Sequence, residues 1–251
     1  MALITTCALI SLWAPSASGS TREVEIPIPN VGMIFSPSVT PKKLSRVETT
    51  PIALNISGRI ETVDGSQPPA VKEFVLDLDR HIAIDARGLP VCKGGQRDLR
   101  FPELNSRCKD AIVGRGKVGV QIQFPELPPI STESELIVFN GGRRDTGKTT
   151  LFAVAHLIQP ITTSFAMTIE ITKHPHGNRA VFEVPKLANG AGSLTYLSAR
   201  LKRRFTRNGK EVDFLTGSCP NGKLESGARA LFVDGTILQG TTLQTCVPSS
   251  T

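Results

Sequence analysis

The sequence is poor in aromatic residues: only 5% of its 251 residues are aromatic, with one Trp and one Tyr. A groove lined by several aromatic rings, of the kind that stacks on sugars, is therefore not expected. No stretch approaches the ~18 consecutive apolar residues of a membrane-spanning helix, so no transmembrane segment is predicted.

Patterns typical of catalytic and metal sites are also scarce. The chain has four His residues and no G-x-S-x-G sequence, which argues against a hydrolase triad. It has no C-x₂-C pair, which argues against a zinc site. His174 and His176 would share one face of a strand, but Pro175 and Gly177 favour a turn, and the spacing suggests no third ligand. The sequence thus predicts no metal and no cofactor.

The N-terminal stretch, residues 1–20, contains no charged residue and has an apolar run from Ala2 to Ala14, followed by small residues. This pattern predicts a signal peptide, although no basic residue precedes Arg22. A buried N-terminal strand is the alternative. If the signal is removed, the chain is secreted, and it remains extracellular or associated with the cell envelope.

Four cysteines remain after Cys7 is assigned to the signal, and four is an even number, as expected for disulfides in an exported protein. Sequence alone permits three pairings. Cys92–Cys108 and Cys219–Cys246 close the shortest loops, so we predict these two local disulfides.

Two-residue hydrophobic alternation indicates β-strands through much of the chain. It is clearest where Val118, Val120, Ile122 and Phe124 alternate with small or polar residues. Asn208-Gly209 is typical of a two-residue hairpin turn, between strands expected at 193–205 and 212–215. A short helix is expected near 104–111. About a dozen short strands without a long helix predict an all-β fold, either a β-sandwich or barrel-like.

We divide the chain into a signal peptide at 1–20, a Pro-rich extended linker or arm at 21–50, and a β domain at 51–251. The arm begins with the alternating residues Val24–Ile28, which suit an edge strand because proline is tolerated there. A division of the β domain into two parts near residue 160 is the alternative.

Several turns and cysteine contexts are similar to those of uncharacterised, β-rich secreted bacterial proteins of unknown function. These stretches are Ile56–Ile60, Gly88–Cys92, Cys108–Gly114, Cys219–Gly222 and Phe232–Thr236. The resemblance implies export and a β fold, and it transfers no catalytic residue.

Residues 142–149 match the phosphate-loop pattern G-x₄-G-K-T, with Gly142, Gly147, Lys148 and Thr149 at the defining positions. A functional phosphate loop is followed by a helix whose N-terminus faces the phosphate. Here no alternating βαβ series follows. We interpret the match as a hairpin loop without nucleotide-binding function.

The chain carries 29 basic and 22 acidic residues, a formal net charge of +7. A cluster of cations spans the expected hairpin: Arg200, Lys202, Arg203, Arg204, Arg207 and Lys210. Such a cluster suits an anionic envelope polymer or polysaccharide, whereas nucleic acid is not expected outside a cell. A solvated strand face that discourages edge aggregation is the competing interpretation.

Two function classes follow. The first is an exported, non-enzymatic binding or envelope-associated protein, with the basic hairpin as its site. The alternative is a secreted, glycosidase-like hydrolase that uses dispersed carboxylates, which a deep cleft with two carboxyl groups roughly 5–10 Å apart would favour.

Overall fold

The computed structural model describes residues 30–93, 103–143 and 147–248. The predicted signal peptide and the start of the arm lie outside the described residues. From Asn30 onward the expected arm contributes strands to the fold, three of them before residue 45.

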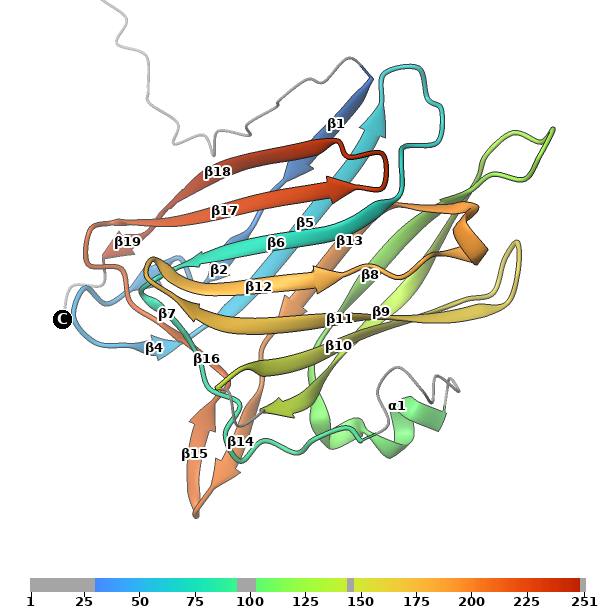
Figure 1. Ribbon diagram of the computed structural model, residues 1–251. Coiled ribbons are helices and arrows are strands. Elements are labelled where there is room, and N and C mark those ends of the chain that lie inside the picture. The colour runs from blue at the N-terminus through green and yellow to red at the C-terminus, as the bar shows by residue number, and fades with distance from the viewer. Residues whose placement is uncertain (1–29, 94–102, 144–146, 249–251) are drawn as a thin grey trace, which may run out of the picture.

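The protein is nearly all β, as predicted, and one large antiparallel sheet curls into a nearly closed barrel (Figure 1). In spatial order its strands are β1 (Val31–Phe35), β5 (Ala53–Thr62), β13 (Gly192–Leu201), β8 (Ile112–Ile122), β9 (Ile130–Arg143), β10 (Thr149–Leu157), β11 (Thr163–His174), β12 (Gly177–Glu183), β6 (Val71–Asp79), β17 (Lys223–Phe232) and β18 (Ile237–Thr245). The short β2 (Ser38–Thr40) also pairs with β5. This sheet runs without interruption across residue 160, because β10 pairs with β11.

Smaller elements surround this sheet. They are the hairpin β14 (Arg204–Arg207) and β15 (Lys210–Asp213), a sheet of β4 (Thr50–Pro51), β16 (Leu215–Gly217) and β7 (Ile82–Ile84), the parallel pair β3 (Lys43–Leu44) and β19 (Val247–Pro248), the helix α1 (Glu103–Arg107), and the 3₁₀ turns η2 (Lys109–Ala111) and η3 (Ala188–Gly190). The helix expected near 104–111 corresponds to α1 and η2. None of the described helices has the length and apolarity needed to cross a membrane.

The core forms inside the curled sheet because alternate side chains of each strand point inward. Val118, Val120 and Ile122 of β8 are fully buried there. Burial of each such side chain stabilises the fold by about 1.5–3 kcal/mol before entropy is counted. A second cluster lies outside the sheet, where Leu104 of α1 packs with Ile137 of β9.

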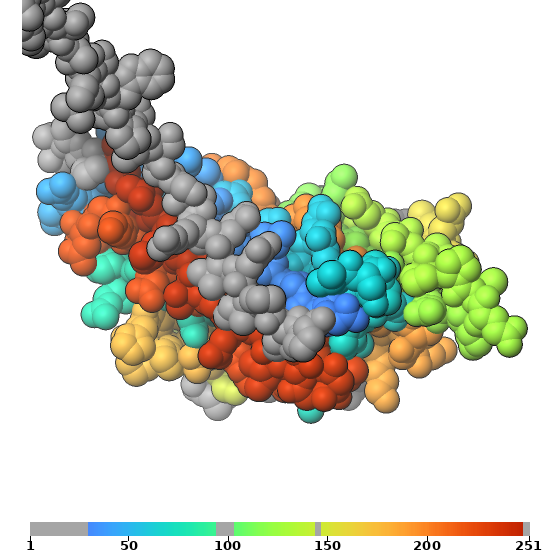
Figure 2. Space-filling model, turned by 90° about the horizontal axis from the view of Figure 1, so that it is seen from above, coloured from blue at the N-terminus to red at the C-terminus, as the bar shows by residue number. Residues whose placement is uncertain are grey.

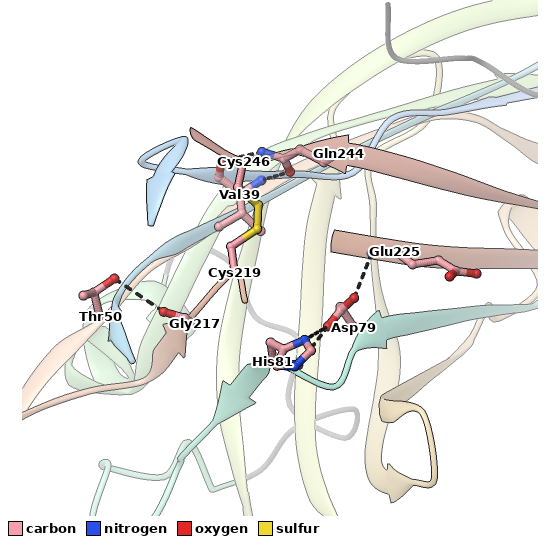
Figure 3. Close-up of a disulfide and its surroundings, with 9 residues drawn as sticks. All are labelled: Val39, Thr50, Asp79, His81, Gly217, Cys219, Glu225, Gln244 and Cys246. Carbon is pink, nitrogen blue, oxygen red and sulfur yellow. Dashed lines mark hydrogen bonds and ion pairs between the residues drawn. A yellow bond between two sulfur atoms is a disulfide. The ribbon is translucent and has the colours of Figure 1, made fainter. Parts of the chain in front are cut away.

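Both predicted disulfides are confirmed. Cys92 and Cys108 are joined at an S–S distance of 2.02 Å, beside the cluster under α1. Cys219 and Cys246 are joined at 2.22 Å and tie the start of β17 to the end of β18 (Figure 3). All four cysteines are buried.

The predicted Asn208-Gly209 turn is confirmed, with φ angles of 52° and 74° at its two central residues. The strand expected at 193–205 is divided instead, since β13 ends at Leu201 and β14 begins at Arg204. At this break the amide of Lys202 bonds to Val113 of β8, and the chain then leaves the main sheet. The β14–β15 hairpin projects from the lower end of the barrel (Figure 1).

Candidate functional site

A polar cleft of about 420 Å³ lies on the outer face of the sheet, over β5, β13, β8 and β9. Its lining residues come from these four strands and from the turn after β5: Arg59, Ile60, Glu61, Thr62, Gly65, Ser66, Pro68, Gly119, Gln121, Ser131, Thr132, Glu133, Thr195 and Tyr196. Most of the lining side chains carry hydroxyl, amide or charged groups, so the cleft suits a polar ligand.

Strand register places four of these residues in one row across the sheet. Arg59 of β5 is paired with Tyr196 of β13, Tyr196 with Gly119 of β8, and Gly119 with Glu133 of β9. Directly opposed residues in antiparallel strands point to the same face. The row therefore places a cation and a carboxylate on the two sides of the only tyrosine.

The floor of the cleft combines a β-bulge with a glycine. The register of β13 against β8 shifts between Leu194 and Tyr196, so that Thr195 is the extra residue. A bulge redirects side chains locally, and both Thr195 and Tyr196 line the cleft. Opposite them, a Cβ atom at Gly119 would lie 2.9 Å from the Cβ atom of Tyr196. Glycine at this position therefore leaves room for the tyrosine.

One wall of the cleft is organised by Arg59. Its Nη1 donates to Oε1 of Glu61 at 3.1 Å, and its guanidinium lies 5.8 Å from the centre of the Tyr196 ring. Both charged side chains are more than half exposed, so the ion pair adds little stability. Its effect is to hold the guanidinium against one face of the ring.

The turn after β5, which lines one side of the cleft, is fixed by the carboxylate of Asp64. This group accepts bonds from the hydroxyl of Ser66 at 2.6 Å, the amide of Ser66 at 3.0 Å, and the side chain of Asn30 at 3.2 Å. The Ser66 bonds, and then the Asn30 bond, lower the pKa of Asp64 to about 2. Asp64 thus stays ionised, and the turn keeps these bonds, at any pH well above 2.

Several polar side chains of the cleft are uncommitted. Within the described residues, no side-chain hydrogen bond is made by Gln121, Ser131, Thr132, Glu133, Thr195 or Tyr196. The cleft therefore contains a carboxylate, an amide and several hydroxyls that make no hydrogen bond to stabilise the described part of the fold. Such groups are available to a ligand.

The predicted basic cluster is only partly available. Arg204 pairs with Asp213 at 3.2 Å and Glu211 at 3.4 Å, and Arg207 pairs with Asp85 at 2.9 Å. Hydrogen bonds, first from Arg87 and then from Arg207, lower the pKa of Asp85 strongly. These carboxylates neutralise much of the charge that the arginines would present.

The remaining four cations differ in their contacts. Arg200 donates to the side-chain oxygen of Asn55 at 2.9 Å, and Arg203 donates to the carbonyl of Asp110 at 3.3 Å. The Nε of Arg203 is buried and has no hydrogen-bond partner among the residues that the structure describes. Lys202 and Lys210 are exposed and make no side-chain bond to any other described residue.

The phosphate-loop sequence lies in a hairpin between β9 and β10. Gly142 belongs to β9, and Thr149 begins β10 and pairs with Arg143. Lys148 lies between Gly147 and β10, and its Nζ is 2.9 Å from Oε2 of Glu170. A strand, β10, follows Lys148 where a phosphate loop needs a helix whose N-terminus faces the phosphate.

The histidines of the turn between β11 and β12 do not define a metal site. The rings of His174 and His176 are 5.7 Å apart, measured between centroids. No group of three or more His, Cys, Asp or Glu residues suited to hold a metal occurs among the described residues.

The cleft contains two carboxylates, Glu61 and Glu133, on strands that are three positions apart in the sheet. At about 4.8 Å per strand, their backbones are about 14 Å apart. Paired glycosidase carboxylates lie roughly 5–10 Å apart. This separation is between backbones and does not set the distance between the two carboxyl groups, so the glycosidase-like alternative stays a prediction.

No sequence pattern indicates this cleft, because its residues come from distant parts of the chain. The available signal was the single tyrosine, at the irregular point of the alternating run Ser193–Leu201. No protein-family model, curated protein or solved structure matches this chain.

Proposed function

We propose that this chain is an exported, non-enzymatic binding protein, and that its polar cleft binds a polysaccharide. The observation that carries the proposal is the row of Arg59, Tyr196, Gly119 and Glu133, with uncommitted polar groups on either side. Sugar hydroxyls both donate and accept hydrogen bonds. Gln121 and the cleft hydroxyls can do the same, while an ionised Glu133 accepts only.

The shape and surroundings of the cleft support a polymeric ligand. It is open on the outer surface of the sheet, so a chain longer than the cleft can continue beyond it. The two disulfides, together with the absence of a membrane-spanning helix among the described residues, are compatible with an extracellular location. Extracellular polysaccharides would be accessible to a protein in that location.

Tyr196→Ala and Glu133→Gln are expected to weaken polysaccharide binding by about tenfold or more, because each removes a central contact. Affinity electrophoresis against a neutral glucan and a uronic-acid polymer would measure this. Leu243→Ala is the matched control: it removes a 52% exposed side chain on β18, far from the cleft. Equal binding by all four proteins, or binding of neither polymer by the parent, would rule out the cleft as the site.

A second candidate is polyanion binding by the β14–β15 hairpin and its flanks. It is supported by two exposed side chains with no partner among the described residues, Lys210 at the start of β15 and Lys202 between β13 and β14. The pairing of Arg204 and Arg207 with carboxylates makes it the weaker candidate.

Changing Lys202, Arg203 and Arg204 together to Gln is expected to reduce binding to a uronic-acid polymer and to flatten its dependence on salt. The reason is that exposed charges are screened over ~8 Å at physiological ionic strength. Titrations at two salt concentrations would measure the effect, with Lys117→Gln on β8 as a single-charge control. Salt-independent binding by the parent would contradict the proposal.

A further inference from the structure

The barrel has one open seam, where the first and last strands of the main sheet meet. The sheet path begins at β1 and ends at β18, and no ladder pairs these two strands. Residues of both strands nevertheless line one narrow groove: Met33, Phe35, Leu238, Gln239, Gly240, Thr241 and Thr242. We call the gap between Val31–Phe35 and Ile237–Leu243 the seam. Seen from above, the blue first strands and the red β17–β18 hairpin lie on the same face of the molecule (Figure 2).

The backbone of β1 directs hydrogen-bonding groups into this seam that pair with no other described residue. In an antiparallel pair, alternate residues direct their N–H and C=O groups toward the partner strand. The bonds Ser36 N–H to Ser57 and Val63 N–H to Asn30 show that even-numbered residues bond to β5. The odd-numbered residues Val31, Met33 and Phe35 therefore direct their backbone groups into the seam.

The odd-numbered residues of β18 also direct their backbone groups into the seam. The N–H of Cys246 donates to the carbonyl of Gly222, and the N–H of Phe232 donates to the carbonyl of Thr236. The even-numbered residues of β18 therefore direct their backbone groups toward β17. Ile237, Gln239 and Thr241 then face the seam. No backbone hydrogen bond crosses from these residues to β1 within the described part of the chain.

The lower end of the seam is closed by a side chain. The amide group of Gln244 accepts from Val39 N–H at 2.7 Å and donates to the Val39 carbonyl at 3.0 Å (Figure 3). It therefore occupies the position of a missing strand residue. Beyond it, Val247 bonds to Lys42, where β19 pairs with β3. Only the stretch opposite Val31–Phe35 remains open.

Open edges of this kind are unfavourable where the flanking residues are buried. Val31 and Phe35 are each 8% exposed, and Leu238 is 2% exposed. A buried backbone group without a partner costs about 1–3 kcal/mol. A strand that added to β1 would satisfy these groups.

We propose that the seam is a strand-accepting site and that its occupant is the segment Val24–Ile28 of this same chain. The 29 residues before Asn30 lie outside the described part, and the chain enters the structure at the upper end of β1, beside the seam. Because only two residues join this segment to β1, its effective concentration at the seam is higher than that of a separate peptide.

The sequence of this segment fits one register. A two-residue loop at Pro29-Asn30 would oppose Ile28 to Val31, Ile26 to Met33 and Val24 to Phe35. Its turn would be of type I, because the ring of Pro29 fixes φ at about −65° and the φ of Asn30 is not positive. These are the odd-numbered residues of β1, whose backbone groups point into the seam.

The prolines also fit this register. Pro27 falls where no N–H is needed toward β1, so the missing donor causes no loss there. Opposed side chains share a face, so Val24, Ile26 and Ile28 would cover the apolar groove. The carboxylate of Glu25 would face solvent.

Paired proline substitutions test this register. Ile26→Pro removes a donor toward β1, whereas Glu25→Pro changes a residue whose N–H points away from β1. We expect the Met33 and Phe35 amides to be protected from hydrogen exchange in the full chain and in Glu25→Pro. In Ile26→Pro their exchange should be at least about fivefold faster. Unprotected amides in the parent, or equal exchange in the two variants, would overturn the proposal.

A cross-link identifies the occupant. In a Cys7→Ser background, Ile26→Cys with Met33→Cys places two cysteines about 5.5 Å apart between Cα atoms, a distance that a disulfide spans. Glu25→Cys with Met33→Cys is the control, because these side chains would point to opposite faces. An intramolecular bond in the first variant alone supports the proposal. A bond between two molecules would assign the seam to a second copy and overturn it.

Discussion

Replacing Gly116 with alanine is expected to lower the free energy of unfolding by about 3 kcal/mol or more. A Cβ atom there would lie 1.8 Å from the carbonyl oxygen of Ser198 and 2.7 Å from the Cα atom of Ala199. Both contacts are with backbone, which cannot rotate away as a side chain can. Because β8 is paired with β13 on one side and β9 on the other, neither strand can shift without breaking a ladder. Urea unfolding of the variant and the parent would measure the loss.

Gly32→Ala is the matched control for this substitution. A Cβ atom at Gly32 would meet nothing within 4 Å, and its φ angle is not positive. Alanine there should leave stability unchanged or raise it by about 0.5 kcal/mol, since glycine in a strand loses more backbone entropy on folding. A similar loss in both variants would show that strand propensity, rather than the close approach of β8 and β13, determines the effect.

Removing the Cys219–Cys246 disulfide is expected to cost about 3.5 kcal/mol of unfolding free energy, from the entropy of closing a loop with a sequence separation of 27. This bond has a further structural role. The amide of Cys219 bonds to Ser45, and β18 ends one residue before Cys246, so the disulfide fixes the closed end of the seam. The double variant Cys219→Ala with Cys246→Ala would be compared with the parent by guanidinium unfolding.

The other disulfide serves as the comparison. Cys92 and Cys108 have a sequence separation of 16, so the double alanine variant should lose about 3 kcal/mol, slightly less than the first. It should not alter the hydrogen exchange of β18, because its surroundings are the cluster under α1. If removing either disulfide leaves the free energy of unfolding unchanged, the loop-entropy model does not account for the stability of this protein.

The parts of this fold that could be predicted from the sequence are local. The alternation of Val118, Val120 and Ile122 directly reflects which side chains face the core. Asn208-Gly209 specifies its own turn, and the two disulfides join cysteines close in sequence. Each of these features depends on a short stretch of chain, so periodicity and turn chemistry suffice.

What could not be predicted depends on strands that are distant in sequence. The cleft requires Tyr196 to lie beside Arg59 on one strand and beside Gly119 on another, and no pattern within any of these segments encodes that pairing. The basic hairpin shows a similar limit. The sequence predicts a cluster of cations across one hairpin, but the strand breaks after Leu201. Arg204 then pairs with Asp213 across the hairpin, and Arg207 pairs with Asp85 from a distant segment.

The order of strands in the sheet has a consequence for how the protein folds. β5, from the first quarter of the chain, pairs with β13, from the last quarter. β6 pairs on its two sides with β12 and β17, which are both made much later. Folding rates fall as contacts become less local, because a long loop must close before those contacts form. The early strands therefore emerge from synthesis with open hydrogen-bonding edges. They stay exposed to wrong pairing until nearly the whole chain has been made.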